Sequence, residues 1–510
     1  SAVPVRNKES AGSDEEYLVT KYVYGTNGVN TYGSPTSEEL YYQYKQNGAW
    51  QQKKLYSTLY RYAANYRYLD QVMDPEGYIT SYEYDTRGRL YREQKGSDKL
   101  ITYGYNSIGR VVSVTETMLE GTDAGETVSY AYTGPRLNAI THNGFSYGFT
   151  YDDYVRRTAV TVGSQTLISY GYDASTGDLN TMTYGNGQVM SFTYDRMGRL
   201  TSVKYNGSTK YVYEYNGIGQ TGRLQDNENN TTWWYYYDGE DRLSLVQGSG
   251  GQRIQYRYGD FNGNSKTVSM KYRLAQNQSV GTEYRYNKKG TVDEIQWSGG
   301  MLRNVFSRDK LERVTERMTY SSLHYLYGLR TWYEYDTYDG YEDSASARIS
   351  AMGFEVKYNP NNTVVNELDM YEYFYDQEGR ITGYRVTDGN TGSAKNVYYY
   401  YDHQNQLRRE NNQILNKTIT YEYAAGGNLQ SRKEYPYTYG DTYLGFQTPV
   451  TISYGYDTAW KDKLTSYDGQ SITYDNLGNP LSYRGMSFTW TGRRMDSAAV
   501  NDVTSSYLYD

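Results

Sequence analysis

A nine-residue phrase that recurs along the chain is the feature that most constrains its fold. Residues 82–90 read YEYDTRGRL, residues 192–200 read FTYDRMGRL and residues 373–381 read YFYDQEGRI. A catalytic motif usually occurs once in a chain, whereas a sequence motif that recurs at regular intervals is typical of repeat architectures. In looser copies, Asp173, Asp195, Asn216 and Asp238 follow a tyrosine at successive distances of 22, 21 and 22 residues. The sequence therefore predicts one supersecondary unit that is repeated along the chain.

Each copy of the phrase reads as a β-hairpin. Side chains alternate along a strand, so Tyr82 and Tyr84 share one face and Glu83 points to the other. Asp85 can accept a hydrogen bond from the backbone N–H two residues on, and Gly88 suits the left-handed position that ends a type I turn in a G1 bulge. The predicted register pairs Asp85 with Arg89, Tyr84 with Leu90, Glu83 with Tyr91 and Tyr82 with Arg92.

Two sets of structural residues follow from this hairpin. The predicted turn residues are Asp85, Gly88, Arg89, Asn106, Gly109, Arg110, Asp195, Gly198, Arg199, Asp376, Gly379 and Arg380. The predicted cross-strand pairs are Tyr84 with Leu90, Tyr105 with Val111, Tyr194 with Leu200 and Tyr375 with Ile381. An aromatic side chain opposite an aliphatic one stabilises a sheet by roughly 0.2–1 kcal/mol. We interpret the Asp–Arg pairs as exposed ion pairs that fasten the turns, because repetition argues against catalysis and such pairs contribute roughly 0–1 kcal/mol.

The composition favours an all-β protein. The chain has 68 tyrosines and 51 glycines among 510 residues, against 9 phenylalanines and 8 prolines. Tyrosine favours strands and glycine permits tight turns, so we predict a long antiparallel sheet of repeated hairpins. Cysteine is absent, which excludes disulfides, zinc–thiolate sites and thiol nucleophiles.

Charge and hydropathy narrow the expected partners and cofactors. The net charge is −7 and no long basic run is present, so we expect no nucleic-acid partner. No run of 18 apolar residues occurs, so we expect no membrane insertion by this segment. We expect no cofactor and no metal or catalytic site. The three histidines, His142, His324 and His403, lie on separate repeats, and the glycine-dense segment 248–253 lacks the G-K-[ST] ending of a phosphate loop.

The chain reads as a polar start followed by one continuous repetitive body. Residues 1–20 are a predicted polar leader or remnant without the apolar core of a signal peptide, and residues 21–510 are a predicted continuous sheet. Its repeats are degenerate over 21–80 and recognisable over 81–510. Three insertions interrupt them: 115–125, an expected loop; 337–352, which we expect to include a short helix; and 435–450, an expected excursion between strands. Because the chain stops inside the phrase, we expect it to be a segment of a longer protein.

The phrases resemble the YD repeats of the bacterial Rhs (rearrangement hotspot) family. That family includes the Wap proteins of Gram-positive bacteria and the C component of insecticidal toxin complexes, and teneurins carry related repeats. The three phrases quoted first match the family pattern, aromatic-x-Tyr-Asp-x-x-Gly-Arg-Leu, closely. Looser matches are YGYNSIGRV at 103–111, YYYDGEDRL at 235–243 and ITYDNLGNPL at 472–481. The resemblance extends over roughly residues 20–510.

The resemblance implies a fold and a function. The fold is a β-sheet that spirals into a hollow shell, or an open segment of such a shell. Bacterial members enclose a C-terminal toxin domain, which implies a non-catalytic scaffold in a secreted or surface-displayed bacterial toxin. The implied partner is a toxin cargo outside these residues. The family's aspartyl autoprotease and plugged core are not found here, so the resemblance assigns no proteolytic residues.

Two other functions stay open at this level. Tyrosine faces stack on sugar rings, which would suit a glycan- or partner-binding surface protein of the adhesin type. A glycoside hydrolase would need two converging acids, and none of the 59 acidic residues is singled out by the sequence. The irregular unit at 337–352 is where such a cleft would be expected.

Overall fold

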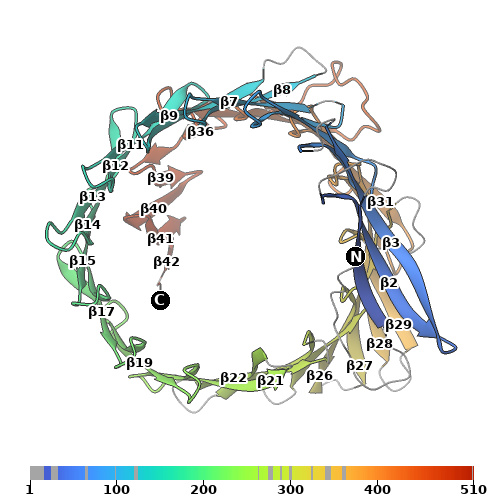
Figure 1. Ribbon diagram of the computed structural model, residues 1–510, viewed down its shortest axis with the longest axis horizontal. Coiled ribbons are helices and arrows are strands. Elements are labelled where there is room, and N and C mark those ends of the chain that lie inside the picture. The colour runs from blue at the N-terminus through green and yellow to red at the C-terminus, as the bar shows by residue number, and fades with distance from the viewer. Residues whose placement is uncertain are drawn as a thin grey trace.

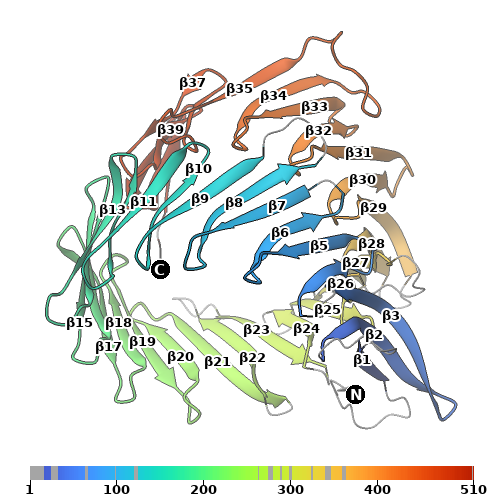
Figure 2. The ribbon, with the colours of Figure 1, turned by 45° about the horizontal axis from the view of Figure 1, so that its top comes forward.

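The chain folds into one long meandering sheet that winds past its own beginning (Figures 1 and 2). The computed structural model describes residues 16–24, 33–63, 67–97, 99–119, 125–261, 264–273, 279–287, 290–297, 301–322, 326–338, 346–358, 363–507 and 509. Within these residues it has 42 strands, 37 of them in one sheet and 5 in a second. Each strand pairs antiparallel with its neighbours in sequence, from β1 with β2 to β36 with β37. The predicted all-β sheet of repeated hairpins is confirmed.

Coil 1 covers residues 16–308. Its first strands are β1 (Glu16–Tyr24), β2 (Pro35–Gln46), β3 (Ala49–Tyr62), β4 (Leu69–Met73), β5 (Ile79–Tyr84), β6 (Leu90–Lys95), β7 (Lys99–Tyr105), β8 (Val111–Met118), β9 (Glu126–Thr133), β10 (Arg136–His142), β11 (Phe145–Tyr151) and β12 (Arg157–Val162). Its later strands are β13 (Gln165–Tyr172), β14 (Leu179–Tyr184), β15 (Val189–Tyr194), β16 (Leu200–Tyr205), β17 (Ser208–Tyr215), β18 (Thr221–Asp226), β19 (Thr231–Tyr237), β20 (Leu243–Gly248), β21 (Arg253–Phe261), β22 (Asn264–Arg273), β23 (Ser279–Tyr286), β24 (Val292–Trp297) and β25 (Leu302–Arg308).

Coil 2 covers residues 309–479 and runs beside coil 1 (Figure 2). Its strands are β26 (Val314–Ser321), β27 (Tyr327–Tyr335), β28 (Ile349–Tyr358), β29 (Thr363–Tyr375), β30 (Ile381–Asp388), β31 (Ala394–Tyr401), β32 (Leu407–Asn412), β33 (Lys417–Tyr423), β34 (Leu429–Pro436), β35 (Val450–Tyr456), β36 (Leu464–Tyr467) and β37 (Gln470–Ser471). The second sheet, here called the inner sheet, starts with β38 (Thr473–Tyr474), which with the turn 475–479 also ends coil 2, and continues with β39 (Pro480–Tyr483), β40 (Met486–Thr491), β41 (Arg494–Val500) and β42 (Val503–Ser506). Its strands β39 to β42 lie inside the ring of coil 1 (Figure 1).

A bulge after each phrase curves the sheet and corrects the predicted register. Tyr84 pairs with Leu90, but Glu83 pairs with Arg92 and Tyr82 with Glu93. The predicted pairing of Glu83 with Tyr91 and of Tyr82 with Arg92 is therefore wrong by one residue. The same shift follows Tyr105, Tyr194 and Tyr375. Bulges bend and twist the strand that carries them, so their repetition bends the sheet into a ring.

The wall is thin, which distinguishes the molecule from a packed globule. The chain exposes 29826 Å² of accessible surface, whereas a compact monomer of this mass exposes roughly 19,000 Å². Among the residues that the structure describes, few hydrophobic side chains are fully buried, and a compact buried cluster joins Phe145, Val162, Leu167 and Leu477. Most of the stabilisation therefore comes from the continuous ladder of strands and from half-buried aromatic faces.

The two coils meet along a seam between opposite edges of the sheet. We call the sheet edge formed by the turns after Tyr–Asp or its equivalents the YD rim, and the opposite edge the back rim. The YD rim of coil 2 lies on the back rim of coil 1: Tyr78 donates to Glu378 at 3.4 Å, Trp460 Nε1 to Tyr147 at 3.0 Å and Asn186 to Asp475 at 2.9 Å. These partners are 300, 313 and 289 residues apart. One circuit of the spiral therefore takes about 300 residues.

The predicted segment boundaries change in places. The first described strand already starts at Glu16, inside the predicted leader 1–20, because EYLVTKYVY alternates as a strand and pairs with β2. The expected loop 115–125 is partly strand, since β8 continues to Met118 and residues 120–124 lie outside the described residues. In the insertion 337–352, residues 339–345 lie outside the described residues, so the expected short helix is not seen where the chain is described. The excursion at 435–450 is a loop between Pro436 and Val450.

Candidate functional site

The turn of each phrase is held by its own aspartate or asparagine. Asp85 Oδ1 accepts from the backbone N–H groups of Arg87 and Arg89 at 2.9 and 3.0 Å, and Oδ2 accepts from Arg89 Nε at 2.7 Å. Gly88 has φ = 78°, the left-handed value that the G1 bulge needs. These hydrogen bonds to Arg89 lower the pKa of the Asp85 carboxyl.

The other predicted turns have the same geometry. Asp195 accepts from Arg199 Nε at 2.7 Å, Asp376 accepts from Arg380 Nε at 2.6 Å, and Asn106 accepts from the Arg110 backbone at 2.9 Å. Gly109, Gly198 and Gly379 all have positive φ. The structure pairs Tyr105 with Val111, Tyr194 with Leu200 and Tyr375 with Ile381.

The arginine and the second tyrosine of the phrase also join neighbouring repeats, which the sequence analysis missed. Arg89 lies over the ring of Tyr105 at 4.3 Å, and the hydroxyl of Tyr105 donates to the Leu90 carbonyl at 2.7 Å. Arg199 and Arg380 lie in the same way over Tyr215 and Tyr401. The Asp–Arg pairs are therefore covered by the next repeat, and the interpretation that they are exposed is wrong. The 16-residue spacing that separates Arg89 from Tyr105 and Arg199 from Tyr215 was the available signal, although Arg380 and Tyr401 are 21 residues apart.

Replacement of Arg199 tests this link between repeats. We expect Arg199→Gln to lower the free energy of unfolding by about 1–2 kcal/mol, because it removes the ion pair with Asp195 and the cation–π contact with Tyr215. Hydrogen–deuterium exchange should accelerate in peptides that cover residues 189–215. The control is Arg196→Gln, which removes the same charge from an exposed position of the same turn. Equal effects of the two substitutions would contradict the assignment.

The inner wall of coil 1 presents aromatic side chains to the inner sheet. A pocket of about 650 Å³ is lined by Tyr205, Tyr211, Tyr213, Trp233, Tyr235 and Tyr256 from coil 1, and by Arg494 and Tyr509. These tyrosines include the first aromatic of several phrases, which the backbone alternation points to one face. Burial raises the pKa values of Tyr205, Tyr213, Tyr235 and Tyr256. The phenols therefore stay neutral at ordinary pH.

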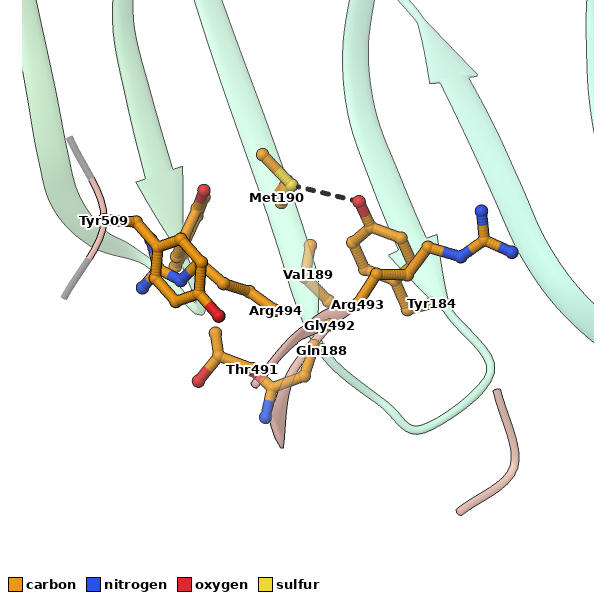
Figure 3. Close-up of a pocket in the computed structure, with 10 residues that line it drawn as sticks. Tyr184, Gln188, Val189, Met190, Thr491, Gly492, Arg493, Arg494 and Tyr509 are labelled. Carbon is orange, nitrogen blue, oxygen red and sulfur yellow. Dashed lines mark hydrogen bonds between the residues drawn. The ribbon is translucent and has the colours of Figure 1, made fainter. Parts of the chain in front are cut away.

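A second pocket separates the inner sheet from the wall. It encloses about 370 Å³ between Tyr184, Met190 and Tyr205 of coil 1 and the segment Thr491–Arg494 with Tyr509. Figure 3 shows Tyr509 and Arg494 facing Met190 across it, with the hydroxyl of Tyr184 directed at the Met190 sulfur at 3.3 Å. The two pockets share Tyr205, Arg494 and Tyr509. They form one continuous aromatic surface, which we call the lumen site.

One ion pair anchors the inner sheet to the wall. Arg494 Nη1 donates to Glu228 Oε2 at 2.9 Å, Nη2 donates to Oε1, and Tyr211 donates to Glu228 at 2.8 Å. The Arg494 hydrogen bonds lower the pKa of Glu228, whereas burial and the Glu228 carboxylate raise the pKa of Tyr211 to about 12. Both side chains of the ion pair are mostly buried. This bidentate ion pair joins residues that are far apart in the sequence, so it holds β41 at a defined place on the wall.

Removing one partner should release the inner sheet. We expect Arg494→Met to cost about 2 kcal/mol, because it leaves Glu228 charged, mostly buried and without its main partner. Peptides covering residues 486–506 should then exchange hydrogen faster, whereas coil 2 should be unchanged. Adding Glu228→Gln to that variant should recover part of the loss, since the uncompensated charge disappears. No acceleration in the inner sheet would contradict the anchoring role.

Residues that could bind a metal ion do not gather in the described part of the chain. Among those residues no group of three or more His, Asp or Glu side chains could hold a metal ion. His142 lies in the seam, 3.3 Å from Asp462, His403 is exposed in a turn, and His324 is outside the described residues. No helix long and apolar enough to cross a membrane occurs in the ranges described.

Comparison with known proteins identifies the architecture. Residues 93–262 match the family described as Teneurin YD-shell. The fold is similar to the Tc holotoxin pore of Photorhabdus luminescens with a mutant TccC3, at 12% identity and a TM-score of 0.60, over 96% of this chain and 29% of that one. It is also similar to a TcdB2-TccC3-Cdc42 crystal structure, at 12% identity and a TM-score of 0.54, over 98% and 30% of the two chains. No protein with a curated description matches the sequence. The chain thus spans about 30% of the length of the structures that share its fold.

Proposed function

Because this chain is a YD-repeat protein with a shell fold, we propose that it forms part of the wall of a container for another polypeptide. The cargo would be the toxin of a secreted or surface-displayed bacterial polymorphic toxin. The lumen site carries this proposal: it is an aromatic surface on the concave side, about 650 Å³ in its larger pocket. Such a role needs no reacting groups, only a surface that tolerates many side chains.

The chemistry of the lumen site suits an extended polypeptide. Tyrosine rings offer apolar faces with a polar tip, so they contact varied side chains without demanding one sequence. The neutral phenols avoid strong charge interactions that would select particular cargo residues.

A protection experiment tests the container. An unfolded, protease-sensitive polypeptide would be joined after residue 510, since β42 lies within the ring (Figure 1). We expect slower cleavage than for the same polypeptide added separately. The variant Tyr213→Ser/Tyr235→Ser should lose part of the protection, whereas Tyr236→Ser, on the opposite face of β19, should not. Cleavage at the same rate in the joined and separate forms would exclude the container role.

A groove between the coils supports a second proposal, binding of a glycan. A pocket of about 700 Å³ is lined by Gln71, Tyr78, Gln94, Asp376 and Glu378, among others. Amide and carboxylate groups beside a tyrosine ring are the groups that hydrogen-bond and stack on sugars. Saturable binding of a defined oligosaccharide that is lost in Gln94→Ala would establish this function. A hydrolase would in addition need turnover of that sugar.

A further inference from the structure

The seam between coil 1 and coil 2 indicates what kind of surface can pack on the YD rim of coil 1. In both coils the third residue of the YD turn points away from the sheet edge. In coil 2 this residue is partly or fully buried at every turn of standard length: Leu311, Glu378, Gln404, Gly426 and Leu477. In coil 1 it is exposed at each such turn where the structure describes it: Arg87, Ile108, Tyr154, Met197, Ile218 and Glu240. The turns have the same backbone, so the difference is whether another coil covers them.

Leu477 shows what the covered state looks like. It is 3% exposed and packs against Phe145, Val162 and Leu167 on the back rim of coil 1. Beside it, Gln165 donates to the Asn476 carbonyl, and Asn186 donates to Asp475 at 2.9 Å. The contact therefore consists of an apolar centre with hydrogen bonds at its margin, the usual anatomy of a protein interface.

The YD rim of coil 1 carries apolar side chains at the same position without a covering coil. Met197 is 80% exposed, and Ile108, Tyr154 and Ile218 are similarly open. A row of large apolar residues on four turns of one edge is unusual for a surface that faces water. Nothing in the local phrase demands them, because Arg87 and Glu240 occupy equivalent turns.

The complementary edge is also free on the same molecule. On the back rim of coil 2 the exposed large side chains include Ile414, Leu415, Tyr439, Tyr443 and Phe446, and Phe446 is 95% exposed. The loop between β34 and β35, which carries Tyr439, Tyr443 and Phe446, is held in place by hydrogen bonds from β32. Buried Arg409 donates to the Thr442 carbonyl and to Thr438 Oγ1, both at 2.7 Å, and Asn411 donates to the Gly440 carbonyl at 2.6 Å. The aromatic tips are thus presented on a fixed support.

We propose that a second copy of this chain docks head to tail, with the back rim of its coil 2 on the YD rim of coil 1. The interface would repeat the seam already present within each molecule: the turn residues Ile108, Tyr154, Met197 and Ile218 on one side, and Ile414, Leu415, Tyr443 and Phe446 on the other. Each copy carries both halves of this contact, so the association is heterologous and extends the spiral from copy to copy. The role of the rims does not depend on the cargo.

Sedimentation velocity on the full chain over a range of concentrations tests this assembly. The wild-type chain should gain mass with concentration. A rim variant, Met197→Lys/Ile218→Lys, and a back-rim variant, Tyr443→Lys/Phe446→Lys, should each associate at least ~10-fold more weakly, because a charge is placed in the apolar centre of the contact. The control is Tyr236→Lys, at an exposed aromatic position on the face of the sheet.

A mixture of the two variants distinguishes the head-to-tail arrangement from others. The rim variant keeps an intact back rim and the back-rim variant keeps an intact YD rim, so the mixture should form a one-to-one dimer that stops there. Circular dichroism of each variant verifies that its sheet is intact. A wild-type chain that stays monomeric, variants that associate as the wild type does, or a mixture that fails to dimerise would overturn the proposal.

Discussion

Replacement of Leu477 by aspartate should separate the two coils. Leu477 is 3% exposed in the apolar cluster with Phe145, Val162 and Leu167. Loss of a buried leucine costs about 2–5 kcal/mol, and the added carboxylate must also leave water. We therefore expect a loss of at least about 4 kcal/mol in the stability of the seam. Hydrogen–deuterium exchange should accelerate in residues 142–167 and 457–480, while the other strands of coil 1 remain protected.

Met197 supplies a matched control for that substitution. It occupies the same position of the same phrase, but it is 80% exposed. We expect Met197→Asp to change stability by less than about 0.5 kcal/mol, measured at a protein concentration where the chain is monomeric. Comparable destabilisation by the two substitutions would show that the turn itself, and not the seam, is sensitive to charge.

Alkaline pH should unfold the wall cooperatively. Burial, together with hydrogen bonds to Glu93 and Glu228, raises the pKa values of Tyr103 and Tyr211 to about 12, from an ordinary value of 10.0. Because the folded state holds these protons more tightly than the unfolded chain does, their stabilisation is complete below pH 10. It is lost as the pH rises from 10 to about 12. Each such tyrosine contributes on the order of 1 kcal/mol after solvent screening, and many tyrosines act together.

Tyrosinate absorbance and far-ultraviolet circular dichroism, recorded in one titration, check this expectation. The two signals should change together above pH 10, since the buried phenols ionise only when the sheet opens. The double variant Tyr103→Phe/Tyr211→Phe should unfold at higher pH than the wild type. Ionisation of most tyrosines with the circular dichroism unchanged would contradict the buried, hydrogen-bonded environment of the wall.

The local phrase determined the hairpin. Asp85, Gly88 and Arg89 have a single low-energy arrangement in a type I turn with a G1 bulge, and their hydrogen bonds lie within four residues. Because such interactions are complete inside the phrase, repetition and composition were enough to predict an all-β sheet of hairpins. The pairing of Tyr84 with Leu90 belongs to the same local unit.

The bulge that follows Leu90, the seam and the lumen site could be seen only in the tertiary structure. The bulge after Leu90 shifts the register because it follows from how strands twist in a curved sheet, not from the turn alone. Met197 and Leu477 stand in nearly the same phrase, yet one is open to water and the other is the centre of the seam. The Arg494–Glu228 pair joins residues 266 positions apart. Burial at such places depends on which strands of coil 1 the spiral meets after a circuit of about 300 residues. The length of that circuit is the sum of many small bends of the sheet, and no single repeat encodes it.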